Sequence, residues 1–77
     1  MNNSNILRLD ELMQEKGLSN AQLVKATELI VPKGISSANI SHYRRGLSQP
    51  NTEKLAILAM ALNVAPTELI NFKYIGK

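Results

Sequence analysis

The sequence has no cysteine, no tryptophan and a single histidine. Without cysteine the chain can form no disulfide framework, no thiolate zinc site and no cysteine nucleophile, and one histidine cannot build a multi-histidine metal site. Two tyrosines and one phenylalanine leave little material for a platform on which single-stranded nucleic acid would stack. We therefore expect neither a metal nor another cofactor in this chain of 77 residues.

Long hydrophobic runs are absent as well. The longest apolar run extends from Leu55 to Leu62, far short of the roughly 20 residues that cross a bilayer. Residues 1–4 are largely polar, and no hydrophobic signal segment follows them. The sequence thus predicts a protein of the cytoplasm without a membrane partner.

Acidic residues are missing from the middle of the chain. Residues 29–52 contain Lys33, Arg44 and Arg45 and no aspartate or glutamate, whereas acids outnumber bases in residues 1–28. The formal charge of +3 therefore rests mainly on the middle segment. A basic segment without acids is typical of a site that binds a polyanion. It is equally consistent with a basic surface that is simply solvated.

Catalytic and phosphate-binding motifs do not occur either. We find no GxGxxG, P-loop, HExxH or GxSxG pattern and no paired metal-ligand spacing. An enzyme would have to be assembled from Asp, Glu, Lys, Ser and one His, and nothing groups these residues. The sequence predicts that the protein is not an enzyme.

What the chain does contain is a series of short helical segments with clear ends. The first is expected over about Asn5 to Lys16, followed by Gly17 as a left-handed cap. The second begins at Ser19, which forms a capping box with Gln22, and should end near residue 29 or 30. Residues 31–34, which contain a proline and a glycine, are expected to form a loop. The alternative is a very short strand at residues 30–31.

Three more helices are predicted after this loop. The third starts at the N-cap Ser36 and runs to about Arg45, where Gly46 ends it. A fourth follows a cap at Asn51 or Thr52 and stops at residue 63, and residue 66 is a proline suited to open a short fifth helix that includes residue 70. Five helices without a convincing strand predict an all-α fold. We expect one domain, residues 1–77, with its core at about 5–70 and a short tail at 71–77.

The third helix carries an outer face of unusual composition. A rotation of about 100° per residue places Ile40 and Tyr43 toward the core. Small, neutral and basic residues occupy the other side: Ala38, His42 and Arg45 lie opposite the core, and Ser41 flanks them. Such a helix suits the DNA major groove, where Ser, Ala and His side chains can reach base edges and arginine can reach phosphate. The alternative is an exposed face that packs against nothing, with the histidine merely solvated.

Three stretches in fixed order resemble the Cro/repressor-type (XRE) helix-turn-helix domain. They are "LMQEKGLSNAQLV", "ISSANISHYRRGLSQP" and "LAILAMALNVAPTELI", and together the resemblance covers residues 7–70. It implies a five-helix, lambda-repressor-like bundle whose recognition helix, about 36–45, lies in the major groove. The likeness to phage repressor N-terminal domains includes a lengthened connection between the second and third helices.

The resemblance also assigns residues to roles. Positions that face bases in the family are occupied here by Ser37, Ala38, Ser41 and His42, and positions that contact phosphate by Asn20, Arg45, Ser48 and Gln49. Two more cations, Arg44 and Lys33, either contact phosphate or stay solvated.

The sequence departs from the family pattern in two places. Seventeen positions separate Leu23 from Ile40, about six more than usual, and the extra residues fall at 28–34. This longer connection bears on the angle between the two helices and hence on Asn20. Ala65 stands where the family often has a Ser or Thr cap, which should cost about 1 kcal/mol at most.

The predicted function is sequence-specific binding of double-stranded DNA by a transcriptional repressor of phage or mobile-element type, associated with the nucleoid. We expect an operator with two-fold symmetry and a homodimer on it. The alternative is a protein-interaction module, or an antitoxin that binds a protein partner through the same helical scaffold.

Overall fold

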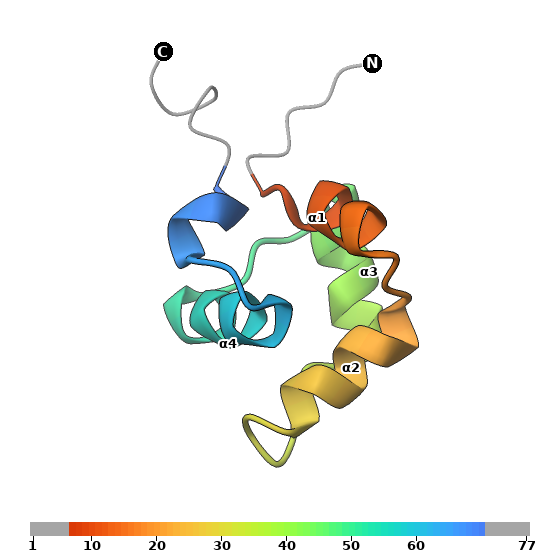
Figure 1. Ribbon diagram of the computed structural model, residues 1–77, viewed down its shortest axis with the longest axis vertical. Coiled ribbons are helices and arrows are strands. Elements are labelled where there is room, and N and C mark those ends of the chain that lie inside the picture. The colour runs from red at the N-terminus through yellow and green to blue at the C-terminus, as the bar shows by residue number, and fades with distance from the viewer. Residues whose placement is uncertain (1–6, 71–77) are drawn as a thin grey trace.

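The computed structural model describes residues 7–70, and within them the regular structure is helical apart from one isolated bridge. Four α-helices, α1 (Leu9–Lys16), α2 (Asn20–Glu28), α3 (Ser37–Arg45) and α4 (Thr52–Leu62), are followed by the 3-10 helix η1 (Pro66–Leu69). In Figure 1, α4 and η1 lie on one side of the molecule, α1 and α3 on the other, and α2 below them. The predicted all-α class is confirmed.

Local caps set most of the helix ends. The Ser19 hydroxyl accepts a hydrogen bond from the Gln22 N–H at 3.2 Å, and the Gln22 side-chain oxygen accepts one from the Ser19 N–H at 2.9 Å, so the expected capping box is present. Asn51, rather than Thr52, caps α4 by accepting a hydrogen bond from the Lys54 N–H at 2.8 Å.

Left-handed residues end three of the helices. Gly17 follows α1 with φ 68°, Gly46 follows α3 with φ 77°, and Asn63 follows α4 with φ 60°. At each end the backbone N–H groups turn back to carbonyls of the last helical turn, which would otherwise lack partners. These ends agree with the sequence-based predictions because each depends on residues next to one another in the chain.

The start of α1 was predicted too early. The helix begins at Leu9, because the residues before it pair with the other end of the described chain. Leu7 forms an antiparallel bridge with Ile70, and the Arg8 N–H donates to the Leu69 carbonyl at 2.7 Å. Backbone groups engaged in this way cannot continue a helix toward Asn5, which itself lies outside the described residues.

The predicted fifth helix is a single 3-10 turn. Its hydrogen bonds connect residues three apart, from the Glu68 N–H to the Ala65 carbonyl at 2.8 Å and from the Ile70 N–H to the Thr67 carbonyl at 3.3 Å. Ile70 is extended rather than helical, since it pairs with Leu7. The described residues therefore contain four α-helices, and the five-helix count needs this correction.

A buried hydroxyl fixes the connection between α2 and α3. The Thr27 side chain is fully buried, donates to the Val24 carbonyl at 2.7 Å and accepts from the Ile35 N–H at 2.9 Å. Gly34 has φ 63°, and a Cβ there would lie 2.6 Å from the Glu28 Cγ. The segment is a loop with turns, as predicted, and α2 ends slightly earlier than expected.

The core lies where the four helices meet. α1 packs against α3, α2 against both α3 and α4, and α4 against η1. Each helix contributes apolar side chains at helical spacing, and burial of this surface is the main stabilising term. The buried apolar residues are Leu7, Leu9, Leu12, Met13, Leu23, Ile35, Ile40, Tyr43, Ile57, Leu58, Ala59, Leu62 and Leu69.

Candidate nucleic-acid interface

Helix α3 is held by its inner face and by both of its ends. Ile40 and Tyr43 are buried in the core, as the sequence predicts. The Ser36 hydroxyl caps the first turn by accepting from the Asn39 N–H at 3.1 Å, and Gly46 terminates the last turn. Because the helix is anchored in this way, its other face is presented in one orientation.

The outer face of α3 carries the residues that were predicted to contact bases. Ser37, Ala38 and His42 are exposed and Ser41 is half-buried. No acidic side chain occurs anywhere in α3, while both Arg44 and Arg45 lie in its last turn. A helix with short side chains and no negative charge can approach a polyanion closely. Whether these side chains contact bases stays a prediction.

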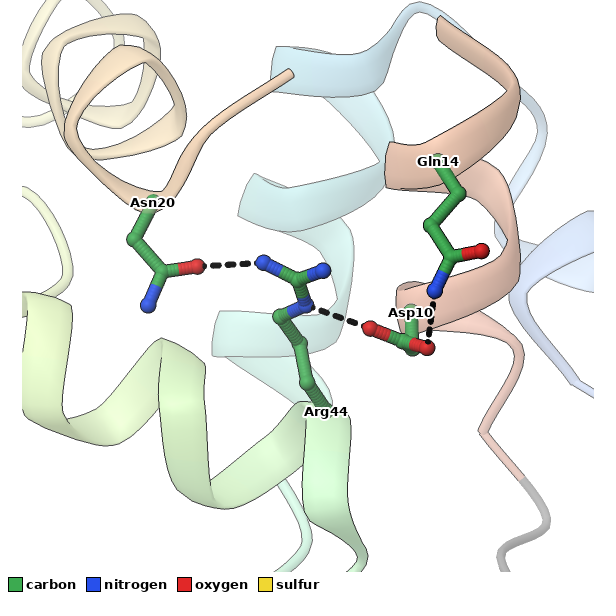
Figure 2. A network of polar contacts seen from close by, with 4 residues as sticks. All are labelled: Asp10, Gln14, Asn20 and Arg44. Carbon is green, nitrogen blue, oxygen red and sulfur yellow. Dashed lines mark hydrogen bonds and ion pairs between the residues drawn. The ribbon is translucent and has the colours of Figure 1, made fainter. Parts of the chain in front are cut away.

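Arg45 and Arg44 are adjacent in sequence but differ in their surroundings. Arg45 is exposed on the outer side of α3. Arg44 turns toward α1 and α2, where its Nε donates to the Asp10 Oδ1 at 2.7 Å and its Nη1 donates to the Asn20 Oδ1 at 2.7 Å. Figure 2 shows the guanidinium between these two side chains, with Gln14 bonded to the far oxygen of Asp10.

Asn20 stands at the first position of α2, beside this arginine. Its amide oxygen is engaged by Arg44, and its amide nitrogen points away from the guanidinium in Figure 2. Within residues 7–70 that nitrogen donates to no protein group. It retains two N–H groups for an external acceptor.

The other predicted phosphate contacts lie in the two connections that flank α3. Ser48 and Gln49 are exposed in the segment between α3 and α4. Lys33 is exposed in the connection between α2 and α3, at the edge of a hollow of about 440 Å³ that also borders Glu53 and Lys54 of α4. The structure therefore distributes these residues over both ends of α3.

Two residues near the site were not predicted to belong to it. The sequence assigned no role to Asp10 or Gln14, yet Asp10 pairs with an arginine 34 positions later in the sequence and accepts a hydrogen bond from Gln14. No local pattern in the sequence signals this ion pair. The sequence contains one indirect indication: the helical angle of Arg44 places it on the flank of α3 and not on the outer face.

Other kinds of site are not built by the described residues. Among residues 7–70 no group of three or more His, Asp or Glu side chains is arranged to hold a metal ion. Over the same range, no helix combines the length and the apolar character that a membrane span requires.

Comparison with protein families shows to which family this helical domain belongs. The model of the Cro/C1-type HTH DNA-binding domain matches residues 8–74. The chain belongs to this family. No curated protein and no solved structure matches it.

Family membership supports DNA as the partner of this domain. The Cro/C1-type family is a family of non-enzymatic DNA-binding domains. The described part of this Cro/C1-type domain also has the longer connection of residues 29–36 that the sequence indicated.

Proposed function

We propose that the protein is a transcriptional repressor of phage or mobile-element type that binds a specific operator in double-stranded DNA. The observation that carries this proposal is the outer face of α3, which is exposed, short-chained and free of acids. α3 enters the major groove, and the bound protein blocks RNA polymerase at an overlapping promoter. The whole chain acts as one DNA-binding domain in the cytoplasm, at the nucleoid.

Base recognition rests on four side chains of α3. The hydroxyls of Ser37 and Ser41 donate to or accept from base edges, the Ala38 methyl contacts a thymine methyl, and His42 donates to guanine acceptors. Ala38 and His42 lie on the side of α3 opposite the buried Ile40, Ser41 flanks that side and is half-buried, and Ser37 is exposed in the first turn.

Phosphate contacts set the affinity and the register of the protein on the duplex. Arg45 provides a fully charged contact at the end of α3, and Lys33 provides another from the preceding connection. Ser48 and Gln49 donate from the loop after α3, and the Asn20 amide donates at the start of α2. Their exposed or half-buried positions around α3 support this assignment.

Two copies of the chain bind one operator with two-fold symmetry, because each domain reads only a half-site. A single domain is small, so we expect the isolated monomer to bind weakly. Operator sites selected from a random DNA pool would show the half-site spacing and hence the geometry of the pair.

A salt titration tests DNA binding itself. Two cationic phosphate contacts per domain, Arg45 and Lys33, make four in the bound pair. The logarithm of the affinity should therefore fall with the logarithm of the salt concentration at a slope of roughly −3 to −4. The measurement is fluorescence anisotropy with a selected site and with a random duplex. A flat line, or no binding to either duplex, would exclude this function and favour the protein-interaction module or antitoxin.

Two single substitutions separate the proposed roles. Arg45→Ala should weaken binding to all duplexes alike, whereas Ser41→Ala should change the preferred sequence with little effect on random DNA. A change of sequence preference in the Arg45 variant would contradict the division into phosphate and base contacts.

A further inference from the structure

The contacts of Arg44 connect three helices at one point. Its guanidinium reaches Asp10 on α1 and Asn20 on α2 while its backbone belongs to α3, and both hydrogen bonds measure 2.7 Å. The ion pair is partly shielded, with 23% of the Arg44 side chain and 43% of the Asp10 side chain exposed. One side chain thereby links α1, α2 and α3 to one another (Figure 2).

This contact determines which end of the Asn20 amide faces outward. An arginine carries only donors, so the amide atom that meets it must be the oxygen. The amide nitrogen is then turned away from Arg44, as Figure 2 shows. Without the arginine the amide could rotate and present its oxygen, which a phosphate would repel.

We propose that Arg44 is a positioning residue for DNA binding and not a phosphate ligand. Arg44 holds the Asn20 oxygen, so that the Asn20 N–H groups are preorganised to donate to a backbone phosphate at the start of α2. Asp10 holds Arg44 in place and offsets its charge. The inference rests on the proposed function of Asn20 as a phosphate contact.

A planar guanidinium is needed for this arrangement. Its donors lie in a rigid fork, so two acceptors on different helices can be bound at the same time. The hydrogen bond between Arg44 and Asn20 also connects the first residue of α2 to the last turn of α3. The distance between the phosphate contact at α2 and the base contacts on α3 is therefore held constant in spite of the longer connection.

Salt dependence distinguishes a positioning arginine from a phosphate ligand. Arg44→Gln should weaken binding to a selected duplex about tenfold, because the neutral Asn20 contact is lost, and the slope against salt should be unchanged. The matched control is Arg45→Gln, which removes the same charge from an exposed neighbour and should reduce the slope by about 0.9 for each bound domain. A similar reduction for Arg44→Gln would overturn the proposal.

The sign of a second substitution gives an independent answer. Asp10→Asn removes an acid and raises the net charge, so electrostatic attraction alone would leave binding equal or tighter. We expect binding to become several-fold weaker, roughly fivefold, because Arg44 loses its anchor. Equal or tighter binding by Asp10→Asn would overturn the proposal, and thermal unfolding of each variant checks that it is folded.

The orientation of Asn20 can also be measured without DNA. In the free protein, NMR relaxation of the Asn20 side-chain amide should report an ordered group, and Arg44→Gln should make it mobile. An amide equally ordered in both proteins would overturn the positioning role. Loss of DNA binding by the unmodified protein would overturn the proposed function instead, so the two failures are distinguishable.

Discussion

The two connections of the α1–α2–α3 unit are built by different means. Residues 17–19 join α1 to α2 through a left-handed glycine and a capping box, all formed by residues next to one another in the chain. Residues 29–36 join α2 to α3 and depend on the buried hydroxyl of Thr27, which receives the N–H of Ile35 from the far end of the connection.

The two connections should therefore differ in the substitutions that they tolerate. The first is closed by local hydrogen bonds at the surface, and a Cβ on Gly17 would have no atom within 4 Å. The second is held by contacts with the protein interior, because there is no space for a Cβ at Gly34 and Thr27 is fully buried. A connection held from inside should be sensitive to substitutions that a locally capped one tolerates.

The largest effect is expected for Gly34→Ala. Gly34 adopts φ 63°, which L-residues rarely adopt, and the new methyl group would lie 2.6 Å from the Glu28 Cγ and 3.0 Å from the Thr27 Oγ1. Backbone strain and the close contacts together should lower the free energy of unfolding by about 3 kcal/mol. Urea denaturation measures this. A loss below about 1 kcal/mol would mean that the connection can relax without cost.

Removing the buried hydroxyl should have the next largest effect. Thr27→Val keeps the side-chain volume but leaves the Ile35 N–H without its acceptor, which should cost about 2 kcal/mol. Hydrogen exchange at Ile35 should accelerate in the same variant. The control is Thr27→Ser, which retains the hydroxyl and should keep the Ile35 amide protected. If the Ile35 amide stayed protected in Thr27→Val and exchanged fast in Thr27→Ser, packing of the methyl group and not the hydrogen bond would hold the connection.

The same distinction explains how far the sequence predicts the fold. Ser19, Gly17, Ser36 and Gly46 were assigned to helix ends from their neighbours alone, and the structure agrees because each cap involves residues within about one turn. The start of α1 and the nature of η1 were predicted wrongly. Both depend on the pairing of Leu7 with Ile70, and no local pattern encodes such a distant contact.

The candidate site divides in the same way. The outward orientation of Ala38, His42 and Arg45 follows from helical periodicity once Ile40 is placed in the core, and their exposure agrees with it. The surroundings of Arg44 could not be predicted, because its acceptors belong to α1 and α2 and approach it only after the helices have packed.

The smallest effect is expected at the first connection and completes the comparison. Gly17 has φ 68°, close to the value at Gly34, but open space around it. In Gly17→Ala only backbone strain should lower the free energy of unfolding, by about 1 kcal/mol. Asparagine tolerates this conformation better and already occupies it at Asn63, where φ is 60°.

Gly17→Asn should consequently cost less than Gly17→Ala, whereas Gly34→Asn should remain as damaging as Gly34→Ala because the contact with Glu28 persists. Urea denaturation of the four variants separates strain from steric contact. Equal losses at the two glycines would show that strain alone governs both connections. In that case the interior contacts of residues 29–36 would add nothing to their rigidity.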